Sequence, residues 1–266
     1  MSNSPLITYT NLTTKHSGKR NHIIDTITIH CYVAQVTAKR GCDYFATTDR
    51  KCSANYVVGL DGSIGLSVDE ANRSWCTSSS ANDNRAVTIE VASEPRHPYA
   101  VTDAAYEALI KLVADICKRN GIKKLVWSTN KNDRVKHLNG CNMTVHRDYA
   151  NKDCPGEYLY ERHGAIAEAV NKLLGATAAA DKKPVKIAPA MSKDDSAKWG
   201  VRFKVTAKSG LNFRSSASAK DNSNLIKTLE TGTKLTWYGY YTGDFYLVQL
   251  ADKSTGYVHK AYLAKA

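Results

Sequence analysis

Two short segments of this chain alternate branched apolar residues with polar ones, which is the pattern of a half-buried β-strand. Residues 26–32 alternate isoleucine with threonine and place His30 on the polar side. Residues 86–92 repeat the alternation and place Glu90 on the polar side. Two such strands, each burying its branched face, can present His30 and Glu90 on one common polar face.

The segments that follow predict the rest of an α/β domain. Residues 54–64 are typical of a hairpin, because Asp-Gly suits a tight turn. Apolar residues keep helical spacing from Thr102 or Asp103 to Asn120-Gly121, where a helix would end. A short strand is expected at 124–127 and a second helix at 161–174. The order of these elements indicates a mixed sheet flanked by helices.

The composition changes after residue 174 and divides the chain. Residues 175–199 are small, polar and interrupted by proline, which is linker composition. Residues 200–266 lack a long helical pattern, and their aromatic or branched runs alternate with glycines. We therefore expect a domain at 1–174, a linker at 175–199 and a small all-β barrel at 200–266.

The charge of the chain limits its partners. The net charge is +12, and residues 176–266 hold 15 Lys or Arg against 7 Asp or Glu. Such an excess suits nucleic acid, an anionic cell wall or a membrane surface. The basic residues are interleaved with acidic ones and no nucleic-acid-binding motif is present, so we expect no nucleic-acid partner. The sequence does not indicate an oligomeric state.

Location and redox state follow from the absence of targeting and disulfide patterns. No apolar run approaches the ~20 residues that span a bilayer, and the first residues lack the features of a signal peptide. We therefore expect synthesis in a cytoplasm and, if the protein acts elsewhere, release by another route. The seven cysteines are an odd number, which favours reduced thiols. A Cys42–Cys52 bridge after release is left open.

Three residues far apart in sequence are candidate metal ligands. His30 ends an alternating strand, and His146 precedes Cys154 by eight residues, so that a loop between them could fold both onto one ion. Two imidazoles and one thiolate leave the fourth tetrahedral position of zinc open, which is the arrangement of catalytic sites. A lone strand histidine is more often structural, so the flanking residues decide the interpretation.

Those flanking residues carry a resemblance to a known family. The segments concerned are Ile24-Asp-Thr-Ile-Thr-Ile-His30, Ser53-Ala-Asn-Tyr-Val-Val-Gly-Leu-Asp-Gly62, Asn82-Asp-Asn-Arg-Ala-Val-Thr-Ile-Glu-Val-Ala92, and Met143-Thr-Val-His146 with Lys152-Asp-Cys-Pro-Gly156. Together they resemble zinc-dependent N-acetylmuramoyl-L-alanine amidases of type 2, which share a fold with peptidoglycan recognition proteins. The resemblance covers about residues 15–175 and is closest to amidase endolysins from phages or prophages of Gram-positive hosts.

The resemblance implies one zinc ion per chain, held by His30, His146 and Cys154. It also places Tyr56, Lys152 and Glu90 around the metal. Lys152 and the Tyr56 hydroxyl would donate to the developing oxyanion, and Glu90 would shuttle a proton between water and the departing amine.

Each of these roles has an ordinary structural alternative. Lys152 could be a solvated loop charge, Tyr56 a core aromatic and Glu90 half of a salt bridge. Trp75 could stack on a sugar or stem peptide or be buried, and Asn55 could bind substrate or cap a turn.

The C-terminal piece resembles a bacterial SH3 domain, a type of module that targets endolysins and autolysins to the cell wall. The likeness rests on residues 205–215, 232–235 and 255–263. Asp244-Phe-Tyr246 replaces the usual Gly-Trp-Tyr, so the binding preference is open.

The resulting interpretation is an endolysin that cleaves the amide between N-acetylmuramic acid and L-alanine with a zinc-activated water. Its partner would be peptidoglycan. The resemblance further implies synthesis in a host cytoplasm without a signal peptide and release to the cell wall through the pore of a phage holin. The alternative is a non-catalytic recognition protein on the same fold, but such relatives usually lack the cysteine ligand, and Cys154 is present.

Overall fold

The computed structural model describes residues 2–175, 192–193 and 200–266, apart from 220–221, 223 and 253. The chain divides into two compact units, Met1–Ala180 and Asp181–Ala266. The linker expected at 175–199 lies almost entirely outside the described residues. Within the described residues, no helix has the length and apolar character needed to cross a bilayer.

A six-stranded mixed sheet forms the centre of the N-terminal unit, in the order β1-β5-β4-β7-β3-β8. Only β4 and β5 are antiparallel; the other neighbours run parallel. The strands are β1 (Tyr9–Thr10), β3 (Thr26–Cys31), β4 (Tyr56–Val58), β5 (Ile64–Leu66), β7 (Ala86–Val91) and β8 (Met143–Thr144). A separate two-stranded sheet joins β2 (His16–Lys19) to β6 (Asn72–Ser74).

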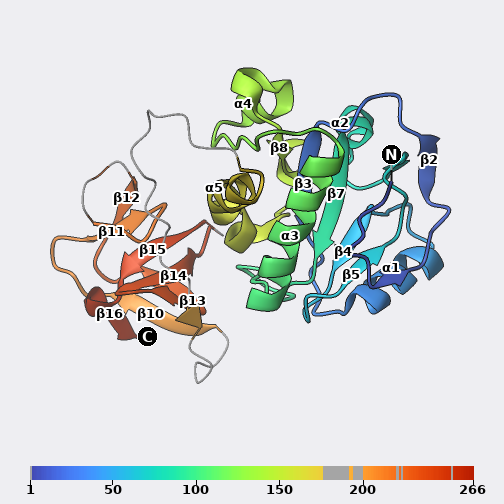
Figure 1. The fold of residues 1–266 in the computed structure, drawn as a ribbon. Coiled ribbons are helices and arrows are strands. Elements are labelled where there is room, and N and C mark those ends of the chain that lie inside the picture. The colour runs from blue at the N-terminus through green and yellow to red at the C-terminus, as the bar shows by residue number, and fades with distance from the viewer. Residues whose placement is uncertain (1, 176–191, 194–199, 220–221, 223, 253) are drawn as a thin grey trace. The chain divides into compact units, whose positions relative to one another are not determined.

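Helices cover the two faces of the sheet unequally. They are α1 (Ala38–Thr47), α2 (Ser80–Arg85), α3 (Asp103–Arg119), α4 (Lys131–Lys136) and α5 (Gly156–Leu173). The two long helices, α3 and α5, lie side by side on one face (Figure 1). Helix α1 packs on the other face, where Gly41 lies against the Val57 side chain. The part of that second face that α1 leaves uncovered carries the candidate site.

Several sequence-based predictions are confirmed. The hairpin at 54–64 is the antiparallel β4–β5 pair. The long helix α3 begins after Thr102, whose hydroxyl accepts a hydrogen bond from the Ala105 amide at 3.1 Å. The last helix starts at Gly156, five residues earlier than predicted.

The strand predicted at 124–127 is wrong. Its backbone groups bond chiefly to amide side chains: the Leu125 amide donates to Asn171 Oδ1 and the Val126 amide to Asn142 Oδ1, both at 2.8 Å. The Val126 carbonyl accepts from the Asn142 backbone amide at 3.2 Å, but no strand ladder forms. Asn171 also donates back to the Leu125 carbonyl at 2.9 Å. The edge strand of the sheet is β8, which the sequence analysis did not predict.

The C-terminal unit is all-β, as expected. Its strands are β9 (Ser192–Lys193), β10 (Val201–Val205), β11 (Leu211–Arg214), β12 (Leu225–Leu229), β13 (Lys234–Thr242), β14 (Phe245–Leu250), β15 (Thr255–His259) and β16 (Leu263–Lys265). Phe203, Phe213 and Trp237 lie in its core. Tyr246, in the segment that departs from the SH3 pattern, stacks on Trp237 with ring centroids 4.1 Å apart.

Close packing between the β4–β5 hairpin and α1 yields a stability prediction. A Cβ at Gly59 would lie 2.5 Å from both the Ala38 amide nitrogen and Ser63 Oγ, which already bond to each other. Gly59→Ala should therefore lower the free energy of unfolding by about 1–3 kcal/mol. The control is Gly164→Ala in α5, where the nearest atom is 3.8 Å away and stability should rise by about 0.4–1 kcal/mol. Denaturant titration measures both, and equal effects would contradict the packing argument.

Candidate metal centre

The register of the parallel strands places His30 beside Glu90. Residue pairs run from Thr26↔Ala86 to Cys31↔Val91, so that His30 lies opposite Glu90. Because parallel partners share a face, both side chains project to the side of the sheet that α3 and α5 do not cover. This confirms the common polar face that the alternation predicted. His30 Nδ1 lies 3.9 Å from Glu90 Oε1.

The same register brings His146 to the other side of His30. Strand β8 pairs Thr144 with Thr28, and their hydroxyls are 2.7 Å apart. His30 and His146 each follow this pair by two residues, so they come to the same face. Their ring centroids are 5.1 Å apart, and His146 begins the short 3₁₀ helix that follows β8.

Cys154 completes the group by way of a closed loop. The Arg147 amide donates to the Cys154 carbonyl at 3.1 Å, and the Ala150 amide donates to the His146 carbonyl at 3.2 Å. Arg147 also reaches Glu157 at 3.5 Å and covers the ring of Tyr160. These bonds fold the loop so that Cys154 returns to His146, which the sequence-based prediction of a shared ion requires.

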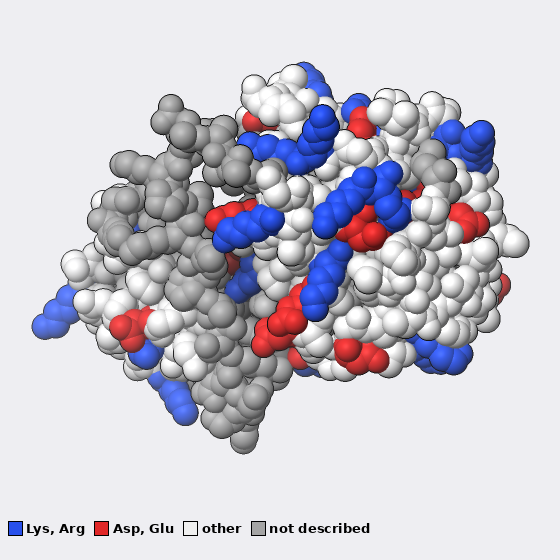
Figure 2. Space-filling view, in the orientation of Figure 1, with Lys and Arg blue, Asp and Glu red and all other residues white. Residues whose placement is uncertain are grey.

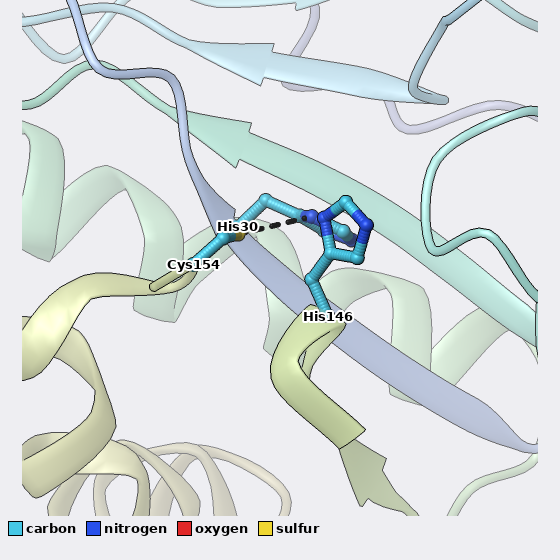
Figure 3. A group of neighbouring side chains, drawn as sticks. All are labelled: His30, His146 and Cys154. Atoms are coloured by element: carbon cyan, nitrogen blue, oxygen red, sulfur yellow. Dashed lines mark hydrogen bonds between the residues drawn. The ribbon is translucent and has the colours of Figure 1, made fainter. Parts of the chain in front are cut away.

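The three candidate ligands converge from three elements. Cys154 Sγ lies 3.2 Å from His30 Nδ1, and the ligating atoms of His30, His146 and Cys154 all lie within 4.8 Å of one another. Figure 3 shows His30 on its strand, with His146 and Cys154 turned toward it. With zinc bonds of about 2.0–2.3 Å, tetrahedral ligand atoms are roughly 3.3–3.8 Å apart, so the spacing suits one ion.

The surroundings keep the imidazoles neutral, the form that binds metals. Burial, followed by the charge of His146, holds the pKa of His30 well below its usual value. Burial, followed by the Lys152 ammonium, lowers the pKa of His146. His30 Nε2 is buried and has no hydrogen-bond partner within the described residues.

Glu90 lies at the edge of the group in a poorly solvated position. Burial, and then the nearby Cys154, raise the pKa of its carboxyl well above the usual range. Within the described part of the chain, Glu90 Oε2 is buried without a hydrogen-bond partner. A carboxyl that readily takes up a proton next to a metal site is suited to general acid–base chemistry.

A cleft of about 460 Å³ opens beside the candidate ligands. His146, Glu90 and Trp75 line it together with Tyr32 and Phe45. Trp75 is half-buried, and its indole nitrogen donates to Ser17 Oγ at 2.6 Å. Lys152 is exposed on the loop between His146 and Cys154.

The structure places two predicted site residues away from the cleft. Tyr56 pairs with Ile89, so it points to the face opposite Glu90, where its hydroxyl donates to Glu70 at 2.5 Å and accepts from the Ser4 amide at 2.8 Å. Asn55 is fully buried. Its amide binds backbone carbonyls of 68, 69 and 72, and its oxygen accepts from Arg20. Asn55 is a structural residue and does not line the cleft beside the candidate ligands.

Sequence analysis missed residues that support the ligands. Arg134 from α4 makes a bidentate ion pair with the buried Asp148, with N–O distances of 2.7 and 2.6 Å. This pair fixes the turn that follows His146. Asn82 donates to Thr28 and accepts from Thr144, joining α2 to the two ligand-bearing strands. Cys76, which lines the cleft and has its sulfur 3.9 Å from Glu90, was not predicted either. Only its position directly after Trp75 could have pointed to it.

An α/β sheet with two imidazoles and a thiolate gathered at an open cleft defines a protein with a candidate three-ligand metal centre. The family model described as N-acetylmuramoyl-L-alanine amidase matches residues 19–157, more than half of the chain. The chain therefore belongs to the N-acetylmuramoyl-L-alanine amidase family. A second model, described as a bacterial SH3 domain, matches residues 209–264.

Solved structures with a similar fold include PlyL, with 16% identity over 61% of this chain and 95% of that one and a TM-score of 0.45. The endolysin amidase LysCS from Clostridium intestinale shares 17% identity over 59% of this chain and 90% of that one, with a TM-score of 0.42. AmpD shares 16% identity over 62% of this chain and 94% of that one, with a TM-score of 0.46. No curated protein matches the chain.

The position of Tyr56 predicts that its hydroxyl is needed for stability and not for chemistry. Tyr56→Phe should leave the amidase rate unchanged while lowering the free energy of unfolding by about 1–3 kcal/mol, because Glu70 and the Ser4 amide lose a buried partner. Rate measurements well below the melting temperature, paired with denaturant titration, test this. A folded variant with a greatly reduced rate would contradict this and show that the Tyr56 hydroxyl takes part in the reaction.

The Arg134–Asp148 pair gives a second prediction for this region. Asp148→Ala leaves a buried guanidinium unpaired and should cost about 3–5 kcal/mol of stability. Replacing both partners, with Arg134→Met and Asp148→Leu, should recover most of that loss, because neither charge is then buried alone. Denaturant titration of the three proteins would contradict the argument if the double variant were the least stable.

Proposed function

We propose that this protein is a zinc-dependent peptidoglycan amidase that cleaves the bond between N-acetylmuramic acid and L-alanine. The observation that supports this most directly is the convergence of His30, His146 and Cys154 beside an open cleft. Its family membership supports the same bond specificity. A recognition protein without catalysis is the second candidate, but it has no need for a complete ligand set.

The residues present fit a zinc ion. Nitrogen and sulfur donors are those zinc prefers, and His30 Nδ1 lies 3.2 Å from Cys154 Sγ, a separation that suits two ligand atoms of one ion. When bound, zinc would act as a Lewis acid toward the carbonyl and lower the pKa of a coordinated water to about 7. One ion per chain is expected.

The side chains around the ligands would handle the protons and the developing charge. Glu90, with a raised pKa, would accept a proton from the attacking water and deliver it to the departing L-alanine amine. Lys152 is close enough to lower the pKa of His146, and its ammonium would stabilise the negative charge on the carbonyl oxygen. Trp75 would contact the sugar or peptide in the cleft.

The bacterial SH3 domain supports action at the cell wall, because a wall-binding module raises the local concentration of a tethered catalytic unit. Figure 2 shows Lys and Arg interspersed with Asp and Glu over the visible face of the N-terminal unit. That distribution favours no continuous nucleic-acid surface on this face. We therefore propose an endolysin whose partner is peptidoglycan.

Metal and product analysis test this function together. The purified full chain should hold about one zinc ion and release new L-alanine amino termini from cell walls without new reducing sugars. Cys154→Ser removes a ligand and should lower the rate by about 100-fold or more, since even outer-shell changes cost 10–100-fold.

Cys52→Ser is the matched control, because Cys52 lines the same cleft but belongs to neither candidate ligand group. It should retain both zinc and activity. New reducing ends in place of amino termini would identify a glycosidase, and full activity of Cys154→Ser would remove the proposed mechanism.

A further inference from the structure

The loop between His146 and Cys154 reaches away from the body of the domain. It comprises residues 147–153, and residues 151–153 are exposed to solvent. Exposed loop residues make few of the packing contacts that fix a conformation. The position of Cys154 relative to His146 therefore depends on the loop residues that do bond to the rest of the domain.

Arg147 ties this loop to helix α5. Its guanidinium donates to the Asp153 carbonyl at 2.5 Å and lies 3.5 Å from the Glu157 carboxylate. The guanidinium carbon is also 4.4 Å from the centre of the Tyr160 ring. Glu157 and Tyr160 are three residues apart on α5 and share one face of it. Arg147 is therefore held by a carboxylate and an aromatic ring of the same helix.

A second arginine is held on the Trp127 ring. The guanidinium carbon of Arg134 lies 4.6 Å from the centre of that ring, and Arg134 forms the ion pair with Asp148 of the loop. The rings of Trp127 and Tyr160 meet edge to face, with centroids 5.5 Å apart and planes at 85°. We call these two rings the aromatic pair. They support the loop at two successive positions, 147 and 148.

The aromatic pair is itself fixed to the domain. The Leu125 backbone exchanges two hydrogen bonds with the Asn171 side chain of α5, and the Ser128 carbonyl accepts from Arg134 at 2.8 Å. These bonds hold Trp127 against α5. An aromatic face attracts a guanidinium electrostatically, which an aliphatic side chain does not. The two rings therefore offer a preformed surface for the two arginines.

We propose that Trp127 and Tyr160 are positioning residues of the metal centre, and this rests on the proposed zinc-dependent function. Neither residue is among the candidate ligands or lines the cleft beside them, so their effect on the centre is indirect. They act through Arg134 and Arg147, which keep Cys154 within reach of the ion. Supporting residues of this kind typically change metal affinity about 10- to 100-fold.

Competition with a zinc chelator measures this effect on the full chain without an activity assay. Tyr160→Leu removes the ring beside Arg147 and should weaken zinc binding about tenfold or more. Tyr160→Phe keeps the ring and should bind zinc within about threefold of the wild type, because the attraction of the guanidinium remains. A purely structural role would lower the melting temperature of Tyr160→Leu and leave the zinc affinity of the folded protein unchanged.

Tyr158→Leu is the matched control. Tyr158 lies on the same helix, and its ring holds the Arg162 guanidinium carbon at 3.9 Å, a contact of the same kind that includes no residue of the loop. This variant should lose stability but bind zinc as tightly as the wild type. Equal losses of zinc affinity in Tyr158→Leu and Tyr160→Leu would overturn the proposal.

Arg147→Met removes the same contact from the loop side, so the test does not depend on Tyr160→Leu folding. It should also weaken zinc binding, and the double variant should lose less than the product of the two single losses, because both changes remove one shared interaction. Losses that simply multiply would overturn the positioning role and leave the three-ligand centre intact. A wild-type chain that binds no zinc would overturn the proposed function itself.

Discussion

The parallel register of three strands is the constraint on which the site depends. β3 lies between β7 and β8, and its pairing with them fixes His30 next to Glu90 on one side and next to His146 on the other. Side chains alternate between faces along a strand, so a shift of one residue in either pairing would send one partner to the face covered by α3 and α5. A one-residue shift of β3 would also move Ile27 and Ile29, which are fully buried, onto the polar face of Thr28 and His30, and this opposes the shift.

Hydrogen bonds and an ion pair from residues outside the sheet hold the candidate ligands in the positions that the strand register sets. The Arg134–Asp148 pair and the backbone bond from Arg147 to Cys154 shape the loop between the two later ligands. Asn82 connects the threonines that precede His30 and His146. Most of these groups are buried and fully bonded, and buried polar networks of that kind specify one arrangement when every member is satisfied.

The sequence could predict what depends on local periodicity and could not predict what depends on register between strands. Alternation alone placed His30 and Glu90 on a shared face, and the C-terminal strands followed from their aromatic runs and glycines. The alternation within β4 did not reveal that Val57, and not Tyr56, lies opposite Glu90. The prediction of a strand at 124–127 was wrong because the side chains of Asn142 and Asn171 bond to its backbone, and no local pattern reveals such partners. Cys76 was missed because its neighbours at the site come from other parts of the chain.

The loop from His146 to Cys154 is closed by hydrogen bonds of its own backbone, which ties the candidate ligands to the rest of the fold. In a small zinc finger, folding must wait for the ion, because nothing else gathers the ligands. Here the Arg147–Cys154 backbone bond and the large sheet assemble the donor atoms in advance. The gathering of these side chains is therefore coupled to the folding of the sheet, and a substitution that loosens the sheet would also separate them.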